Sequence, residues 1–310
     1  MPRTVQRRPL VMGVLNVTPD SFSDGGRYLR PDAAIRRAEQ LAAEGADLID
    51  IGGESTRPGS QPVPLEEELR RVVPVIRTLA GRVRVPISID TSKAEVARQA
   101  VEHGAAMVND VTALHGDPRM AEVVARAKVP VILMHMRGTP RTMQRAPRYR
   151  DVVAEVRTFL ADARRRAECA GIPRERILLD PGLGFGKTVA HNLLLLRHLD
   201  ELVALGQPVV IGPSRKSFIG RTLEAEVVAP PARRDTSSPA WSVPARSDER
   251  LAGTLACVAA AARQGVHIVR VHDVKAAVQF LTMWSAIHDE TRREHRPRRH
   301  RAPSPARIAA

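Results

Sequence analysis

Aromatic side chains are scarce in this sequence, and their scarcity limits the kinds of surface that the chain can offer. Phe, Trp and Tyr together make up 3% of the 310 residues. That is too few for a surface on which nucleic-acid bases stack. The net charge of +14 would otherwise suggest such a partner. We therefore predict no specific nucleic-acid partner, and a role based on the basic ends is the minor alternative.

Much of the positive charge lies at the two ends of the chain. Residues 1–8 contain Arg3, Arg7 and Arg8, and residues 289–310 contain seven arginines against three acidic residues. These two ends carry half of the net charge, in segments whose composition is typical of disorder. We predict a basic N-terminal arm over 1–9, a folded domain over 10–288 and a disordered basic tail over 289–310.

Long apolar runs are also missing, and none approaches the roughly 18 residues that a membrane span needs. The apolar run that follows the first arginines is short and ends at Asn16 without a small-residue cleavage site, unlike a signal peptide. We predict a cytoplasmic protein without a membrane partner. The only two cysteines, Cys169 and Cys257, have no metal-ligand neighbours, so we expect reduced and buried thiols.

Eight strand-like runs alternate with helical patterns along the chain. The runs are Leu10–Leu15, Leu48–Ile51, Val85–Ile89, Met107–Val111, Val129–Met134, Ile177–Leu179, Val209–Ile211 and His267–Val271. Amphipathic stretches such as Leu65–Leu79, Asp151–Ala170 and Ala190–Leu205 lie between them. Buried strands separated by helices pair in parallel. The pattern predicts an α/β fold, a single (β/α)8 TIM barrel, with a doubly wound open sheet as the alternative.

One segment interrupts this alternation. Residues Ala229–Ser247 are rich in proline, serine and alanine, which is typical of a disordered segment. We predict that 229–247 is a disordered insertion in the seventh helical region, because a helical pattern resumes after it.

Polar side chains follow most of the predicted strands at the point where each strand ends. Asp90, Asn109 and Asp180 end the third, fourth and sixth strands. The carboxyl ends of barrel strands meet at one rim, where barrel enzymes place their active sites. Two carboxylates and a carboxamide in one apolar cup suit a flat polar heterocycle. For Asp90 a simple helix-capping role is the alternative, because Thr91 and Ser92 follow it before a helix.

The stretch PGLGFGKT after the sixth strand resembles a phosphate-binding P-loop but has Pro181 where that motif requires glycine. We interpret its glycines as letting the backbone approach a ligand, with Phe185 as an apolar platform. Lys216 and Ser217 follow the seventh strand at the start of a helix. Since the chain has only five lysines, Lys216 is a candidate contact for a ring carbonyl or an anion.

Four further residues have the chemistry of a phosphate site, namely Arg270, His272, Asn16 and Arg57. Arginine suits bidentate contact with phosphate, and barrels often bind phosphate near strands seven and eight. The amide oxygen of Asn16 is also a hard ligand suited to Mg²⁺. For His272, an orienting or capping role is an equal alternative.

Taken in order, these stretches resemble the dihydropteroate synthase family over Val11–Asp273. The motifs that carry the resemblance are NVTPDSFSDGG, DIGGESTRPG, ISIDTSKAEV, NDV, LMHMRGTPRTMQ, LLDPGLGFGKT, IGPSRKSFIG, ERLAGTLA and VRVHDV. The family consists of (β/α)8 transferases of folate biosynthesis, usually homodimeric. They join 6-hydroxymethyl-7,8-dihydropterin diphosphate to 4-aminobenzoate, release diphosphate, and are inhibited by sulfonamides that mimic the aminobenzoate.

The resemblance implies a role for each matching residue. It implies pterin binding by Asp90, Asn109, Asp180 and Lys216, with Val111, Met134 and Gly212 as walls. It implies diphosphate binding by Asn16, Arg57, Arg270 and His272, with Mg²⁺ at Asn16. It implies an aminobenzoate pocket of Thr56, Arg57, Pro58, Phe185 and Ser217, and loops Thr18–Gly26 and Gly53–Gln61 that close over the reactants.

The implied reaction is dissociative. Diphosphate leaves first, stabilised by arginines and Mg²⁺, and the arylamine then attacks a pterin-methyl cation. Lys216, Asp180, Arg270, His272 and Asp24 are the expected catalytic residues, with the two carboxylates offsetting the cation. Two alternatives remain: a non-catalytic pterin-binding paralogue, and a module that transfers methyl from a methylated folate to a corrinoid.

Overall fold

Eight parallel strands form the wall of a barrel in the computed structural model, which describes residues 8–18, 31–56, 59–227 and 247–288. The strands are β1 (Leu10–Asn16), β2 (Leu48–Gly52), β3 (Ile87–Asp90), β4 (Met107–Asp110), β5 (Val131–Met134), β6 (Ile177–Asp180), β7 (Val210–Ile211) and β8 (Ile268–Val271). They pair in the order β6-β5-β4-β3-β2-β1-β8-β7. A bridge between Leu179 and Val209 joins the two ends of this sheet, so the predicted barrel is confirmed.

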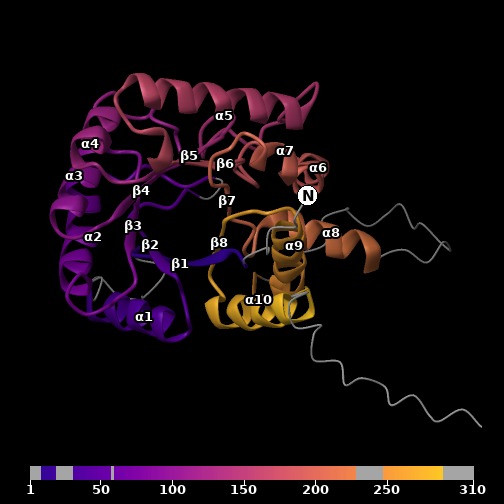
Figure 1. Ribbon diagram of the computed structural model, residues 1–310, viewed down its shortest axis with the longest axis horizontal. Helices are drawn as coiled ribbons and strands as arrows, with labels where there is room; N and C mark the ends of the chain where they lie inside the picture. Colours follow the sequence, from indigo (N-terminus) through magenta and orange to yellow (C-terminus); the bar gives the residue numbers. More distant parts are fainter. Residues whose placement is uncertain (1–7, 19–30, 57–58, 228–246, 289–310) are drawn as a thin grey trace, which may run out of the picture.

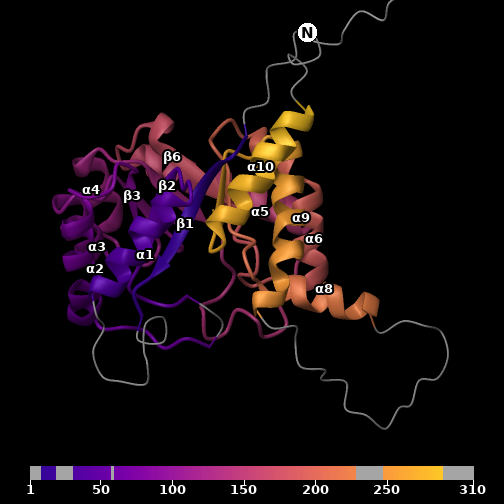
Figure 2. The same ribbon diagram turned by 90° about the horizontal axis from the view of Figure 1, so that it is seen from below.

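Helices surround the barrel wall (Figure 1). They are α1 (Pro31–Ala43), α2 (Leu65–Leu79), α3 (Ala94–Glu102), α4 (Met120–Ala127), α5 (Val152–Cys169), α6 (Val189–Arg197), α7 (Leu199–Val203), α8 (Ser217–Val227), α9 (Leu251–Arg263) and α10 (Val274–His288), with short 3-10 turns at Arg174–Arg176 and Ser247–Arg250. Figure 2 shows α1 to α4 on one side and α8, α9 and α10 on the other, with β1 running obliquely between them.

Alternation along the strands separates two apolar cores. Residues such as Ile49 and Ile51 of β2 belong to the large core between the sheet and the helices. Their neighbours on the other face form a second cluster inside the barrel, consisting of Met12, Leu48, Ile132, Leu178, Val210 and Ile268. Each fully buried aliphatic side chain stabilises the fold by about 1.5–3 kcal/mol. Because side chains alternate with period two, polar residues two positions further along these strands also face the interior.

The positions of the helices differ from the sequence prediction in one place. The predicted helix Ala190–Leu205 consists of α6 and α7, which are separated at His198, a residue with non-helical backbone angles (φ −120°, ψ 36°). The side chain of Gln264 accepts a hydrogen bond from the Leu199 amide at 2.9 Å. A helix cap supplied by a residue 65 positions away gives no signal in the local sequence pattern, which explains why the break between α6 and α7 was not predicted.

The prediction of two buried thiols is half wrong. Cys257 is buried, but Cys169 is exposed on the last turn of α5. The predicted insertion 229–247, except its last residue, and the predicted tail 289–310 lie outside the described residues, as do the first seven residues of the predicted arm. Arg8 of that arm does have a partner, because its guanidinium pairs with Asp47 at 3.1 Å.

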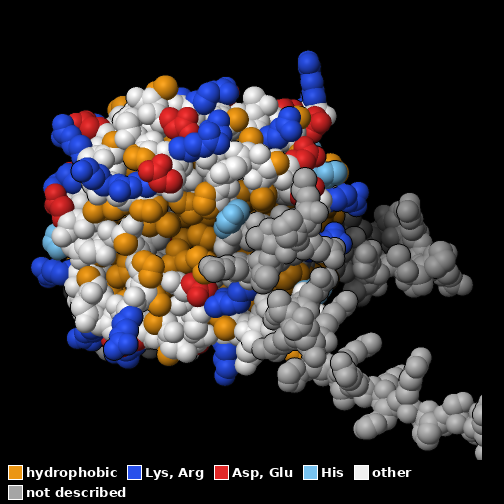
Figure 3. Space-filling model, in the orientation of Figure 1, with side chains coloured by type: hydrophobic (Ala, Val, Ile, Leu, Met, Phe, Trp, Pro, Cys, Tyr) orange, Lys and Arg blue, Asp and Glu red, His pale blue; other side chains and the backbone are white. Residues whose placement is uncertain are grey.

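Two surface findings bear on the predicted partners. No helix in the described part of the chain is long and apolar enough to cross a membrane. On the face shown in Figure 3, lysine and arginine side chains are interspersed with aspartate and glutamate around a central apolar area.

Candidate active site

Five polar side chains from different strands occupy the barrel interior above the inner apolar cluster. Asp50, Asp90, Asn109 and Asp180 are 0–7% exposed, and Arg270 contributes the matching cation from β8. The register places Asp90 opposite Asn109 on the neighbouring strand. It likewise places Asp180 opposite Met134. The strand ends therefore converge as the sequence predicted.

The Arg270 guanidinium joins these side chains into one network. Its Nε donates to the Asp50 carboxylate at 2.6 Å and its second amino nitrogen donates to Asp90 at 2.7 Å. The Asn109 amide donates to the same Asp50 oxygen at 3.0 Å. Burial by itself lowers the pKa of Arg270, but the two carboxylates outweigh burial and raise it. Arg270 therefore stays charged inside the barrel.

Asp90 has an unusual protonation equilibrium because of this setting. Burial raises its pKa from 3.8 to about 7, against the opposing effect of Arg270 and with a further increase from Asp50. A helix-capping role is excluded in this structure, since the first amide of α3, that of Ala94, donates to Asp117 instead. The carboxylate contacts Arg270 instead.

Asp180 and Lys216 influence each other electrostatically. Asp180 accepts a hydrogen bond from the Gly182 amide at 2.7 Å. Burial raises the pKa of Asp180, and Lys216 is the main group that opposes the rise. Burial also lowers the pKa of Lys216 to about 8, with Asp180 opposing. Arg270 lowers the pKa of both groups, so the charges of the three predicted residues influence one another.

The predicted apolar residues line the same cup. Met134 and Val111 are 3% and 7% exposed. A Cβ on Gly212 would lie 3.8 Å from the Arg270 side chain, so this glycine adjoins the network. Phe185 lies under Lys216, whose ammonium is 4.3 Å from the centre of the ring. The cup thus has an apolar wall and a charged rim, which suits a flat heterocycle with polar edges.

The loops after β7 and β8 form the remaining part of the rim. The hydroxyl of Ser214 lies 3.1 Å from Nδ1 of His272 and accepts a hydrogen bond from the His272 amide. Arg215 pairs with Asp273, with Nε at 2.9 Å from the carboxylate. These contacts give His272 an orientation, which the sequence left open as an alternative to ligand contact. Asn16 ends β1 and is half-buried.

Some predicted residues are less well placed or cannot be placed. Asp24, Arg57 and Pro58 lie outside the described residues. Thr56 is half-buried in the segment after β2, and Ser217 is exposed as the first residue of α8.

Sequence reasoning missed Asp50, which organises the network. Asp50 is fully buried, and one of its oxygens has no hydrogen-bond partner within the described chain. Its signal is a single acidic residue within the apolar strand LIDIG. A charge in such a strand costs several kcal/mol unless it is paired, so it predicts a buried partner.

The comparisons with known proteins agree with this geometry. Residues 12–272 match the model of the family described as pterin binding enzyme. The dihydropteroate synthase of Escherichia coli K12 is 47% identical over 90% of this chain and 91% of its own length. The chain belongs to the dihydropteroate synthase family.

Two solved structures of dihydropteroate synthase from Xanthomonas albilineans extend the likeness to the fold. One, with 4-aminobenzoic acid, has a TM-score of 0.80 and 49% identity, and the match covers 91% of this chain and 93% of that one. The other, in complex with 7,8-dihydropteroate, has a TM-score of 0.77 and 45% identity over 92% and 95% of the two chains. As a member of this family, the chain is a transferase.

The Arg270 network predicts a large loss of stability when its cation is removed. The variant Arg270→Met leaves Asp50 and Asp90 buried without their charge partner, which should lower the free energy of unfolding by about 3–5 kcal/mol at neutral pH. Urea denaturation measures this change. The control Arg126→Met breaks the exposed pair with Glu122 on α4 and should have little effect.

The pH dependence of that loss has a defined sign. Arg270 lowers the pKa of Asp90, so its removal raises this pKa further above that of the unfolded chain. A carboxyl group with a raised pKa destabilises the fold as pH rises from the unfolded pKa towards the folded one. Wild-type Asp90 already takes up its proton at about pH 7 in the fold, so the deficit that this residue adds in Arg270→Met should grow as pH rises above about 7 and change little between about pH 4 and 7. A deficit independent of pH would contradict this account.

Proposed function

We propose that this chain condenses 6-hydroxymethyl-7,8-dihydropterin diphosphate with 4-aminobenzoate to give 7,8-dihydropteroate and diphosphate. The observation that carries the proposal is the single cup in which Asp90, Asn109, Asp180, Lys216 and Arg270 converge. A pterin is a flat ring whose edge carries both hydrogen-bond donors and acceptors, and this set of groups can satisfy both.

Each group of the cup has a task in pterin binding. The carboxylates of Asp90 and Asp180 accept hydrogen bonds from ring N–H and amino groups, and Asn109 can do either. Lys216 donates to the ring carbonyl. Val111, Met134 and Gly212 bound the faces of the ring, and their burial excludes water from it.

The reaction needs a departing anion and a transient cation to be stabilised. The bond between the pterin methylene carbon and the diphosphate oxygen breaks, with the electron pair leaving on diphosphate. The aminobenzoate nitrogen then bonds to that carbon and loses a proton. We assign the leaving diphosphate to Asn16, Arg57, Arg270 and His272, because cations and amides at the strand ends stabilise developing negative charge. Asp180 and Asp24 offset the cation.

Mg²⁺ is part of this proposal. The described residues include no cluster of three or more His, Cys, Asp or Glu that could hold a metal on its own. A single amide oxygen at Asn16 fits a Mg²⁺ ion held mainly by waters and substrate phosphate oxygens. When bound, the ion would neutralise charge on the leaving diphosphate.

The aminobenzoate would lie between Phe185 and the segment that contains Thr56 and Pro58, with Ser217 at the carboxylate end. Phe185 is half-exposed and lies beside Lys216, as a platform for a second ring requires. We expect sulfonamides to compete at this place.

We also infer a homodimer. Leu223 of α8 and Met283 and Ile287 of α10 are 37–66% exposed, on helices that lie on the same side of the barrel (Figure 2). Sedimentation should give twice the chain mass, and Met283→Glu with Ile287→Glu should shift it towards the monomer. The cytoplasmic location stays a prediction from the sequence.

Turnover by the purified full-length chain tests the function. With Mg²⁺ and fresh substrates, formation of dihydropteroate is expected, and Asp180→Asn should reduce it by at least about tenfold, since a charged acceptor is lost. If the wild-type chain binds the pterin diphosphate but makes no product, the chain is a non-catalytic paralogue. Methyl transfer from a methylated folate to a corrinoid would favour the other alternative.

The pH profile of the free enzyme should report Lys216. Since its pKa is about 8, kcat/KM for the pterin diphosphate should fall tenfold per pH unit above pH 8, as the lysine loses its proton. In Lys216→Arg this alkaline limb should disappear, because the guanidinium stays charged, although the overall rate will be lower. An unchanged limb in Lys216→Arg would show that another group titrates there.

A further inference from the structure

The loop between β6 and α6, residues 181–188, is held in shape by side chains that bind its backbone carbonyl groups. The carbonyl oxygens from 182 to 186 each accept a hydrogen bond from a side chain. The donors are Lys187 to Gly182 and Phe185, Lys216 to Leu183, Gln144 to Gly184, and Tyr149 to Gly186. Four long side chains therefore set the course of this loop.

The glycines of the loop permit this course. Gly182, Gly184 and Gly186 all have positive φ, at 65°, 81° and 63°. A Cβ on Gly182 would lie 1.9 Å from the carbonyl oxygen of His135, and one on Gly186 would lie 2.4 Å from that of Arg137. The loop thus packs directly on the segment after β5, which explains the glycine spacing that resembles a P-loop without being one.

Lys187 is the buried support of the loop. The residue is 3% exposed. Its ammonium lies 2.9 Å from the Gly182 oxygen, 3.0 Å from the Phe185 oxygen and 2.9 Å from Nδ1 of His135. The carbonyl oxygen of His135 is a fourth, more distant acceptor at 3.5 Å, and burial lowers the pKa of Lys187 well below its usual value. Burial lowers the pKa of His135 to about 3, so the ring is neutral and Nδ1 is able to accept.

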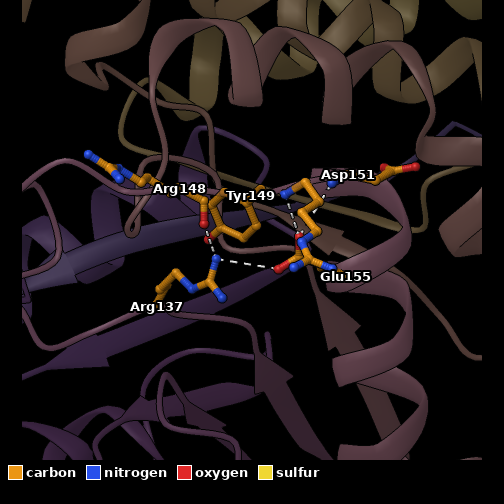
Figure 4. Close-up of a pocket in the computed structure, with 6 residues that line it drawn as sticks. Arg137, Arg148, Tyr149, Asp151 and Glu155 are labelled. Carbon is orange, nitrogen blue, oxygen red and sulfur yellow. Dashed lines mark hydrogen bonds and ion pairs between the residues drawn. The ribbon is translucent and has the colours of Figure 1, made fainter.

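Tyr149 supports the other end of the loop from a more accessible place. Its hydroxyl donates to the Gly186 oxygen at 2.9 Å. The ring lies 4.5 Å from the Arg137 guanidinium and meets the His191 ring edge-on at 4.9 Å. Figure 4 shows Tyr149 beside Arg137 in a hollow that Glu155 also lines. The ring contacts hold Tyr149 in place, and its hydroxyl in turn fixes the carbonyl of Gly186.

These supporting contacts determine the position of Phe185. Lys187 holds the carbonyl of Phe185 itself, and Tyr149 holds that of the next residue, Gly186. The ring of Phe185 lies under Lys216. We propose that Lys187 and Tyr149 are positioning residues for 4-aminobenzoate, acting through the backbone of this loop on the Phe185 platform. This inference rests on the proposed condensation, and it adds two residues that touch no substrate.

The variant Tyr149→Phe tests the proposal with the least disturbance, because the ring and its two neighbours remain and only the hydroxyl is lost. We expect KM for 4-aminobenzoate to rise about three- to tenfold, as the loss of one partly buried hydrogen bond allows. KM for the pterin diphosphate should stay within about twofold, since Tyr149 holds the Gly186 end of the loop whereas Asp180 is bonded to its Gly182 end.

Lys187→Met removes the buried support and should raise the aminobenzoate KM more than Tyr149→Phe does, with a lower thermal midpoint. Its matched control is Lys275→Met on α10, where the lysine is exposed. This control should resemble the wild type in both constants. If Lys187→Met does not fold, Tyr149→Phe carries the test alone.

Three outcomes separate the possibilities. A selective rise in the aminobenzoate KM in Tyr149→Phe supports the proposal. No change, or an equal change in both KM values, means that the hydroxyl serves folding alone and overturns it. A wild-type chain and a Lys275→Met control that both lack turnover would refute the proposed condensation itself, and this inference with it.

Discussion

A single buried guanidinium determines the arrangement of the barrel mouth. Arg270 lies between Asp50 and Asp90, which come from the second and third strands, while Arg270 comes from the eighth. Two carboxylates at this depth would be costly without a cation, and the cation would be costly without them. The three charges therefore hold each other in place, and Asn109 joins them through Asp50. A site held in this way is ready for substrate before substrate arrives.

Arg270 also acts on the remaining charged residues of the site. It is hydrogen-bonded to Asp50 and Asp90, and its charge lowers the pKa of Asp180 and of Lys216. Burial moves the pKa of Asp90 to about 7 and that of Lys216 to about 8, close to neutrality. Groups with such values change their charge at little cost when a ligand binds. Met134 lies opposite Asp180 on the neighbouring strand, and the ring of Phe185 lies under Lys216.

Much of this was visible in the sequence, for a physical reason. Asp90, Asn109 and Asp180 each end a buried parallel strand, and parallel strands in a barrel end at one rim. The sequence did not show which residue pairs with each of the charged side chains. Arg270 was assigned to diphosphate, yet it contacts Asp50, 220 residues away along the chain. Asp50 itself lies in the middle of a strand. Alternation with period two indicates that its side chain faces the barrel interior, but it does not indicate whether the residue belongs to a binding site. Lys187 was equally hidden, since its acceptors are backbone carbonyls that any sequence would supply.

The role of the Arg270 network as the substrate site is tested most directly by Asp50→Asn. Asp50 is fully buried and accepts hydrogen bonds from Arg270 and Asn109, so it orients both. Calorimetric titration with the pterin diphosphate should show a dissociation constant at least about tenfold weaker in this variant, because a charged hydrogen-bond acceptor is lost. A folded Asp50→Asn protein with wild-type affinity would contradict the account.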